Sequence, residues 1–182
     1  MSSPGRRQQF EDIADEVFQP LQRYLRRRAD ASDADDALSE VMLTIWRRLD
    51  ESPAGGAALP WAYGIARRTL ANQRRGQARR LRLAQRMESE PGNRVFPDPA
   101  DDGPDAELTT ALDSLKDRDR EILRLWAWEQ LEAREIATVL ELTVNAATLR
   151  LSRAKKRLSE ELSRQDEDSA GHKWVEGTQE SR

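Results

Sequence analysis

The residues best suited to chemistry in this 182-residue sequence are arginines and lysines that gather in two stretches. Residues 61–87 contain eight arginines and no acidic residue, and residues 149–158, LRLSRAKKRL, contain five cations. A solvated helix normally mixes charge signs, because like charges four positions apart repel one another. Uncompensated cations therefore indicate a polyanion partner. Phosphate contacts that release counterions make nucleic acid the expected one.

Residues suited to catalysis are scarce. The sequence has no cysteine, which excludes disulfides, thiol nucleophiles and zinc fingers. The single histidine, His172, lies in a polar stretch where a solvated side chain is expected. Ser152 and Lys155 match a Ser-x-x-Lys pattern, which is common by chance and lacks its companion motifs here. We therefore expect no enzyme, no cofactor and no bound metal; a divalent-metal requirement would favour a nuclease instead.

Charge and composition divide the chain into segments, although the formal net charge is only −3. Residues 1–87 have 16 arginines against 11 acidic residues, whereas residues 88–107 have one against seven. The second stretch also contains four prolines and two glycines, as linkers do. We predict two domains, a flexible acidic linker between them and a disordered tail, with the boundaries 10–87, 88–105, 106–164 and 165–182.

Both predicted domains are helical. In the first, apolar residues recur at spacings of three and four from Phe10 to Leu25, a stripe that includes Phe18. Ser32 offers an N-cap for a second helix, and Pro60 suits the first turn of a third helix that would bury Trp61. No segment alternates with period two for long enough to indicate a sheet, so we predict an all-α protein of two small helical domains.

The second predicted helix carries a polar face opposite its apolar stripe. The side chains on that face are those of Asp36, Ser39, Glu40 and Leu43. An exposed acidic face is compatible with solubility alone. The pattern therefore leaves two interpretations open, a solvated face and a surface that binds a partner.

The second domain ends in a helix-turn-helix pattern. A short helix over residues 132–140 is followed, after three residues, by a longer helix with an apolar stripe from Ala147 to Leu162. If that stripe packs inward, six other side chains face outward, namely Asn145, Thr148, Leu149, Ser152, Arg153 and Lys156. Such a helix enters the major groove of DNA N-terminus first, and its cations follow the phosphate backbone.

The arrangement resembles bacterial RNA polymerase sigma factors of the extracytoplasmic-function group, in the sigma-70 family. The resemblance is carried, in the family's order, by DADDALSEVMLTIW, LPWAYGIARRTLANQRRGQARR, LDSLKDRDREILRLW, EIATVL and RLSRAKKRL. It implies that the first domain is sigma region 2 and the second is region 4. It also implies a cytoplasmic protein with three partners: core RNA polymerase, promoter DNA and an anti-sigma factor.

The resemblance assigns roles within region 2. It implies that core polymerase binds Asp36, Ser39, Glu40 and Leu43, although the family often has Gln at the position of Ser39. It implies that the opened, single-stranded −10 element is held by Trp61, Arg67, Arg68, Asn72, Arg74 and Arg75. The loop Gly55–Leu59 would receive an unstacked base, and the family usually has Asn at the position of Arg68.

In region 4 the resemblance implies recognition of the double-stranded −35 element. The matching positions are Thr143, Thr148, Leu149, Ser152 and Arg153. Thr148 and Leu149 replace a more polar pair, so we predict a −35 preference that relies on thymine methyl groups and DNA shape. Glu141 stands where the family has glycine, and a left-handed backbone there would cost about 1–2 kcal/mol.

Two functions follow as hypotheses. The first is a sigma factor that binds core polymerase, directs it to promoters and helps open the −10 element by binding energy. The alternative is a helix-turn-helix regulator that binds DNA without joining polymerase, and tight promoter binding without core enzyme would favour it. We expect no membrane insertion, because no run approaches the roughly 18–20 apolar residues that a spanning helix needs.

Overall fold

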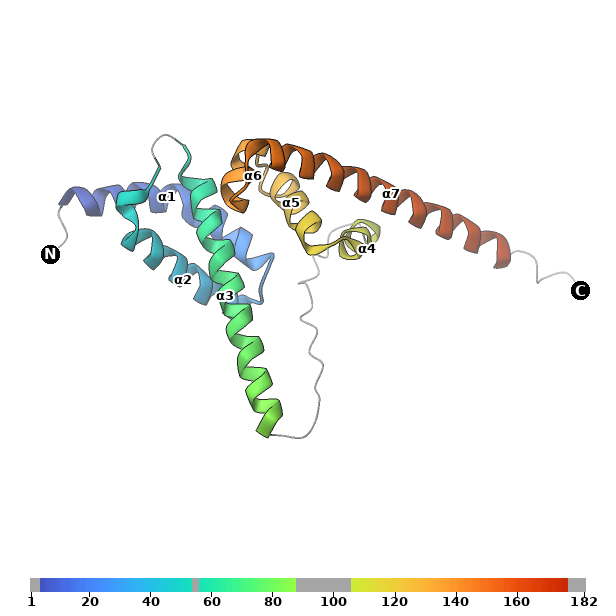
Figure 1. Ribbon diagram of the computed structural model, residues 1–182, viewed down its shortest axis with the longest axis horizontal. Helices are drawn as coiled ribbons and strands as arrows, with labels where there is room; N and C mark the ends of the chain where they lie inside the picture. The colour runs from blue at the N-terminus through green and yellow to red at the C-terminus, as the bar shows by residue number, and fades with distance from the viewer. Residues whose placement is uncertain (1–3, 54–55, 88–105, 177–182) are drawn as a thin grey trace, which may run out of the picture. The chain divides into compact units, whose positions relative to one another are not determined.

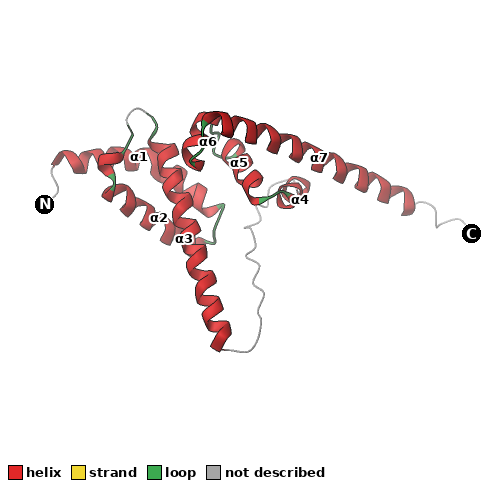
Figure 2. Cartoon of the chain, viewed as in Figure 1, coloured by secondary structure: helices red, strands yellow, loops and turns green. Residues whose placement is uncertain are grey.

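The computed structural model describes residues 4–53, 56–87 and 106–176 (Figure 1). Helices and the turns between them account for these ranges, which contain no strand (Figure 2). The chain divides into two compact units, residues 1–101 together with Thr138–Glu141, and residues 102–137 together with 142–182. Residues 88–105 lie outside the described residues. The predicted linker therefore stays a prediction, whereas the all-α class is confirmed.

The first unit is a bundle of three α-helices with a short 3₁₀ helix. Helices α1 (Pro4–Arg26), α2 (Ala31–Arg47) and α3 (Ala58–Met87) pack against one another in all three pairs. The 3₁₀ helix η1 (Leu49–Glu51) follows α2 and contacts α1. The core contains Val17 and Leu21 from α1 and Ile45 from α2, all of them fully buried. These residues belong to the apolar stripes that the sequence predicted.

Three details of the first unit differ from the predictions. Asp30, not Ser32, caps α2, because its carboxylate accepts a hydrogen bond from the Asp33 N–H at 2.9 Å. Phe18 is 40 % exposed, because it lies at the edge of the stripe rather than at its centre. Trp61 is half-buried in the first turn of α3. Pro60 does fall in that turn, as predicted.

The N-terminal part of α1 is fixed to the end of α2. The Arg6 guanidinium donates to both carboxylate oxygens of Asp50 at 2.8 Å and to the Trp46 carbonyl at 3.1 Å. The Phe10 ring meets the Trp46 ring edge-on, with centroids 5.3 Å apart. Nearby, the hydrogen bond from Arg48 lowers the pKa of the Glu51 carboxyl. These contacts fix one end of α2 and leave the α2 face described below uncovered by α1.

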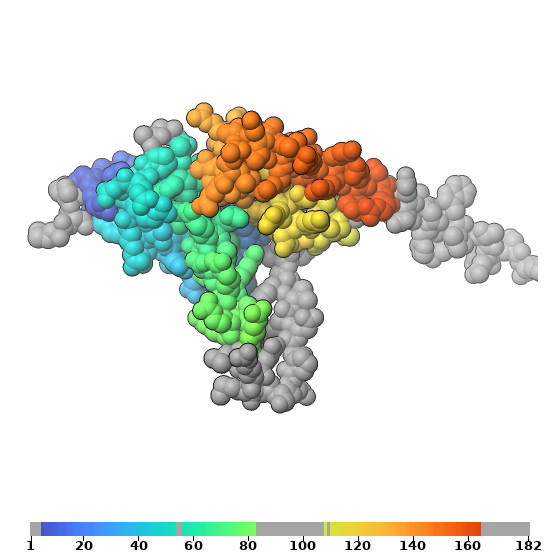
Figure 3. Space-filling view, in the orientation of Figure 1, coloured from blue at the N-terminus to red at the C-terminus, as the bar shows by residue number. Residues whose placement is uncertain are grey.

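The second unit contains α4 (Ala106–Ser114), α5 (Asp117–Ala127), α7 (Val144–Glu176) and the start of α6 (Ala133–Leu140), whose residues from Thr138 onward group with the first unit. Helices α4 and α5 both pack against α7, which is visible in the space-filling view where α7 is orange to red and α4 yellow (Figure 3). The core is built from Ile122, Leu125, Ile136 and Ala147, all fully buried.

Helix α7 is longer than the sequence predicted. A disordered tail was expected from residue 165, but the helix continues to Glu176. Extending an existing helix adds one hydrogen bond per residue without a new nucleus, and no proline interrupts this segment. Residues 177–182 lie outside the described residues.

The turn between α6 and α7 contains a left-handed residue at the position where the resembled family has glycine. Glu141 has φ +56°, the Glu141 N–H donates to the Thr138 carbonyl at 3.4 Å, and the Leu142 N–H donates to the Ala137 carbonyl at 2.9 Å. This pair of bonds is a Schellman motif, in which glycine is the usual left-handed residue. Glu141 therefore occupies a backbone conformation that disfavours its side chain, and the turn stays tight.

Candidate polymerase and nucleic-acid interfaces

The polar face of α2 is exposed along its whole predicted length. Asp36, Ser39 and Glu40 are exposed, and Leu43 is 47 % exposed, which leaves an apolar side chain beside two carboxylates. The Ser39 hydroxyl donates to the Asp35 carbonyl at 3.1 Å, within the helix. Neither Asp36 nor Glu40 forms an ion pair with another described residue. Two unpaired carboxylates followed, one turn later, by an exposed leucine fit a protein partner with basic and apolar groups.

Helix α3 is largely buried in its first half and largely exposed in its second half. Ala62, Ile65, Ala66 and Leu70 are buried, so the first half of the helix is held in the bundle. From Ala71 onward most described side chains are exposed, and the exposed arginines of the helix are Arg67, Arg68, Arg74, Arg75, Arg79, Arg80 and Arg82. The exposed arginines therefore begin in the half of α3 that packs in the bundle, on its outer side, and continue along the half that does not pack there.

Most of these arginines lack an internal counterion. Among the described residues, no carboxylate pairs with Arg67, Arg75, Arg79, Arg80 or Arg82. Arg75 instead donates to the side-chain oxygen of exposed Asn72 at 2.5 Å. Unneutralised guanidinium groups on one helix favour binding to phosphates, as the sequence predicted.

Arg74 has a different environment from the other predicted −10 residues. Its guanidinium donates to the Arg28 carbonyl at 2.8 Å, at the C-terminal end of α1. Arg28 in turn stacks on Tyr24, and the Tyr24 ring lies 4.9 Å from the Tyr63 ring of α3. The Arg74 hydrogen bond thus attaches α3 to the residues that connect α1 to α2. No local pattern in the sequence indicates this contact, because its partner lies 46 positions away.

A second hydrogen bond attaches α3 to the start of α2. The Gln77 side-chain amide donates to a carboxylate oxygen of Asp33, in the first turn of α2, at 2.7 Å. Arg74 and Gln77 lie one turn apart on α3, so together they fix the start of α2. The acidic face of α2 and the arginines of α3 are therefore held in one rigid arrangement.

The outward face of α7 is placed as predicted. Thr143, Asn145, Thr148, Leu149, Ser152, Arg153 and Lys156 are all exposed. Opposite them, Ala147, Leu151 and Ala154 are buried, while Leu158 and Leu162 are half-buried. Leu149 is 51 % exposed, so its side chain is accessible to a ligand.

Two hydroxyls of this face are engaged within the helix. The Thr143 hydroxyl accepts a hydrogen bond from the Ala146 N–H at 3.2 Å and caps α7. The Thr148 hydroxyl donates to the Val144 carbonyl at 2.9 Å. Thr148 therefore presents its methyl group outward together with Leu149, which strengthens the expectation of apolar contacts to DNA.

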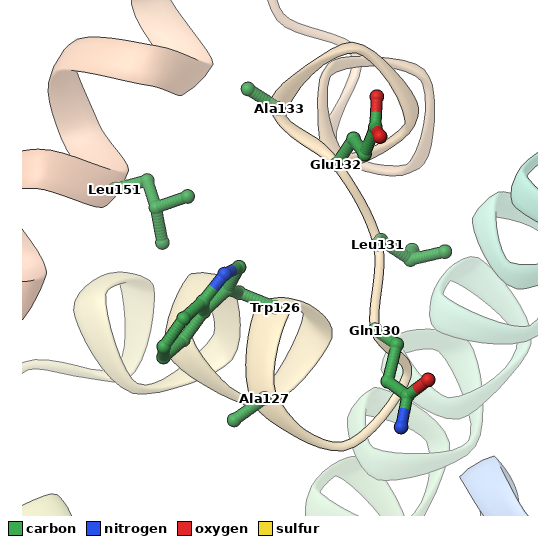
Figure 4. Close-up of a pocket in the computed structure, with 7 residues that line it drawn as sticks. All are labelled: Trp126, Ala127, Gln130, Leu131, Glu132, Ala133 and Leu151. Atoms are coloured by element: carbon green, nitrogen blue, oxygen red, sulfur yellow. The ribbon is translucent and has the colours of Figure 1, made fainter.

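An apolar hollow in the second unit is lined by residues of α5, α7 and the segment that leads into α6 (Figure 4). It has a volume of about 600 Å³ and is lined mainly by Trp126, Ala127, Leu131, Ala133 and Leu151. The ammonium group of Lys155 lies 3.4 Å from the centre of the Trp126 ring. A cation over an aromatic face is attracted by the ring quadrupole, so Lys155 is partly engaged by its own domain.

Neither a membrane-spanning helix nor a metal-ligand cluster occurs among the described residues. No helix among them has an apolar stretch long enough to cross a bilayer. Within the same residues, no group of three or more histidine, cysteine or acidic side chains is placed to hold a metal ion.

Comparison with known families connects these two surfaces. Residues 18–80 match the model of sigma-70 region 2, and residues 105–158 match the model of sigma-70 region 4. Together the two matches cover more than half of the chain. The chain belongs to the sigma-70 family. The first match contains α2 and the start of the α3 arginine surface, and the second contains the helix-turn-helix.

Solved structures show the same fold. The sigma factor RpoE from Bartonella quintana, in complex with the anti-sigma factor NepR, aligns with a TM-score of 0.63 at 22 % identity. That alignment covers 85 % of this chain and 96 % of RpoE. CnrH, in complex with the cytosolic domain of CnrY, aligns with a TM-score of 0.56 at 23 % identity over 85 % of this chain and 87 % of CnrH. No curated protein sequence matches the chain.

The family settles the general function. Region 2 followed by region 4 is the organisation of a sigma factor of the extracytoplasmic-function type, which works with RNA polymerase at promoter DNA in transcription initiation. The alternative, a helix-turn-helix regulator that acts without polymerase, is not favoured, because such a protein has no need of a region 2 domain.

Proposed function

We propose a specific division of labour between the two regions of this sigma factor. Residues 10–87 serve as region 2, residues 106–164 as region 4, and residues 88–105 as the connection between them. The protein acts in the cytoplasm and is not an enzyme: it recruits polymerase and opens DNA by binding energy alone. The observation that carries this proposal is that unpaired acidic and basic surfaces lie on neighbouring helices of region 2.

Core polymerase docks on α2. Asp36 and Glu40 supply carboxylates without internal counterions, and Leu43 supplies an exposed apolar contact. A charged pair at a protein interface mainly fixes register and speeds association, while the buried apolar group adds affinity. Ser39 contributes least, because its hydroxyl already donates to the Asp35 carbonyl.

The opened −10 strand lies along α3. Arg67 and Arg75 are exposed and pair with no carboxylate of the described residues, whereas exposed Arg68 pairs with Glu141 and must give up that pair to bind the strand. Half-buried Trp61 offers a ring on which a base can stack. Arg74 supports this surface from behind through the Arg28 carbonyl. In the loop predicted to receive a base, residues 54–55 lie outside the described residues, and Ala58 and Leu59 already belong to α3, so the candidate loop shortens to Gly56 and Ala57.

The −35 element is read by α7. Asn145, Ser152 and Arg153 supply polar contacts, whereas the Thr148 methyl group and Leu149 contact thymine methyl groups. We expect Leu149→Ser to change the preferred base at one −35 position. The difference in binding free energy between bases at that position should change by about 1–3 kcal/mol. Promoter selection from a randomised −35 library measures this change, and an unaltered consensus would exclude a role for Leu149.

An anti-sigma factor is a further proposed partner. The similar RpoE was crystallised with the anti-sigma factor NepR, which supports a comparable regulator for this chain. Such a protein has to cover the surfaces used for polymerase or DNA, and exposed Leu43 and Leu149 are suitable apolar anchors.

Co-purification with core polymerase tests the proposal. The wild-type chain is expected to bind core enzyme and to give specific transcripts, whereas the double variant Asp36→Ala/Glu40→Ala binds poorly and gives few. A matched control, Asp15→Ala/Glu16→Ala, removes the same charge from exposed positions of α1 and is expected to behave as wild type. Equal binding by both variants would contradict docking through α2.

A further inference from the structure

Arg68 differs from the other exposed arginines of α3 because it has a carboxylate partner. Its guanidinium donates a hydrogen bond to the Glu141 carboxylate and forms an ion pair with it. No carboxylate of the described residues pairs with Arg67 or Arg75, which lie on the same helix. The charge of Arg68 is therefore partly neutralised before a ligand arrives, whereas the charges of Arg67 and Arg75 are not.

The backbone holds Glu141 close to Arg68. Residues Thr138–Glu141 group with the first unit, and they pack against α3 there. A Cβ atom built on Gly64, one turn before Arg68 on α3, would lie 3.8 Å from the Val139 carbonyl oxygen. Val139 is only 1 % exposed. The ion pair thus lies beside a close backbone contact and does not depend on two long side chains meeting in solvent.

The Glu141 carboxylate also acts on a second arginine of the first unit. The pKa of Arg48 is raised chiefly by its hydrogen bond to Glu51, and the charges of Glu51 and then of Glu141 raise it further, while burial lowers it. Glu141 therefore lies in a basic environment made by Arg48 and Arg68. A carboxylate between guanidinium groups takes the place that a phosphate group would occupy, because both anions offer a pair of oxygens to the same donors.

The position of Glu141 is unfavourable for a residue with a side chain. Its φ of +56° lies in the left-handed region, which glycine adopts without a penalty, and the family has glycine here. Arg68 likewise stands where the family usually has Asn. Strained residues persist where the surrounding structure retains them, and they cluster at functional contacts. The ion pair joins these two departures from the family pattern, and a glycine could not form it.

We propose that Glu141 is an internal competitor of the −10 strand: its carboxylate holds the Arg68 guanidinium until a phosphate group of the opened strand replaces it. The inference rests on the proposed function, in which α3 binds this strand. Arg67 and Arg75 make the first contacts, because they carry no internal counterion, and Arg68 joins them only after Glu141 has been displaced. The protein alone therefore binds the strand more weakly than it would without the Glu141 charge.

The affinity of the whole chain for a labelled single-stranded −10 oligonucleotide tests the proposal. Glu141→Gln removes the charge and keeps the side-chain size, so the strain at φ +56° stays the same. It is expected to raise the affinity about threefold, within the range of an exposed ion pair. Glu132→Gln, a matched control, removes the same charge from an exposed residue outside the contact and should raise the affinity by less than about 1.5-fold.

A double-mutant cycle shows whether Glu141 acts through Arg68. In the wild-type background, Arg68→Gln is expected to lower the affinity little, because Glu141 already holds this arginine. In the Glu141→Gln background, the same substitution should lower the affinity by a factor about threefold larger. Once Arg68 has been replaced, Glu141→Gln should leave the affinity unchanged. Thermal unfolding of each variant checks that the protein remains folded.

Failure of this inference differs from failure of the proposed function. Suppose that Arg67→Gln and Arg75→Gln weaken binding, but Glu141→Gln leaves the affinity unchanged or raises it equally when Arg68 has been replaced. The −10 strand then binds α3, and Glu141 is not its competitor. If none of the arginine substitutions changes the affinity in either background, α3 does not bind the strand and the proposed function itself is wrong.

Discussion

The two cation-rich helices of this sigma factor look alike in sequence and differ in structure. On α3, exposed Arg67, Arg79 and Arg82 have no carboxylate partner among the described residues. On α7, Lys155, Lys156 and Arg157 each contact a side chain of the same unit. A count of cations therefore overstates the charge that α7 offers to DNA, whereas on α3 it comes closer to the available charge.

The difference matches the ligand that we propose for each helix, the opened −10 strand for α3 and the −35 duplex for α7. A strand opened to single-stranded form has a flexible backbone, and a row of free cations can follow it in many conformations. A duplex read in the major groove requires a fixed helix orientation, because base contacts tolerate little displacement. Ion pairs such as Arg157 with Asp119 supply that fixed orientation on α7.

The acidic face of α2 should show the largest effect, because its charges are the least engaged. Replacing Asp36→Ala together with Glu40→Ala is expected to lower affinity for core polymerase about a hundredfold, since each close charge pair at an interface contributes at least about 1.5 kcal/mol. Titration of labelled protein with core enzyme measures the change. A loss below threefold would mean that these carboxylates are only a solvated face.

Asp119 tests whether α7 depends on its internal ion pair. Asp119→Asn is expected to destabilise the packing of α5 on α7 by about 2 kcal/mol, because a buried partner of a charged group is lost while Arg157 stays half-exposed. Hydrogen exchange of α5 and α7 amides in the full chain reports the local opening. Glu160→Gln breaks the exposed pair with Lys156. It should change the free energy of local opening, as measured by hydrogen exchange, by less than about 0.5 kcal/mol.

Arg74 separates structural from DNA-binding arginines on α3. Arg74→Ala is expected to lower the free energy of unfolding of the first unit by about 1–2 kcal/mol, since the Arg28 carbonyl loses its charged donor. Arg75→Ala is expected to leave stability within about 0.5 kcal/mol and to weaken −10 strand binding instead. Urea unfolding and binding to a single-stranded −10 oligonucleotide distinguish the two. The reverse pattern would contradict these roles.

Glu141 should give the smallest effect, and it is a gain. Glu141→Gly is expected to stabilise the helix-turn-helix by about 1 kcal/mol, because glycine adopts a φ of +56° without a side-chain penalty. Hydrogen exchange at the Leu142 amide, which donates to the Ala137 carbonyl, measures the change. A loss of stability would show that the Glu141 side chain contributes more than its backbone strain costs.

Features that depend on neighbouring residues were predictable from the sequence. The buried stripes of α1 and α7 follow from periodicity. A left-handed backbone at Glu141 was considered only because the resembled family has glycine at that position. The cap of α2 was placed two residues too late, because Asp30 and Ser32 are about equally good N-caps and tertiary context chose between them.

Contacts between distant residues could not be predicted in the same way. The partners of Arg74 and Arg157 lie 46 and 38 positions away in the sequence, so no local pattern distinguishes these arginines from their neighbours. For the same reason, the environments of the five cations of residues 149–158 could not be distinguished from the sequence. The extension of α7 to Glu176 was missed because polar composition was taken to indicate disorder, although the segment contains no proline.

In vitro transcription from a promoter library, with core polymerase and this protein, tests the central claim most directly. We predict specific initiation from promoters that share a −10 and a −35 element, strong dependence on both elements, and loss of the transcripts with Asp36→Ala/Glu40→Ala at equal protein concentration. Transcripts that do not depend on the added protein, or that persist unchanged with the double variant, would contradict the account.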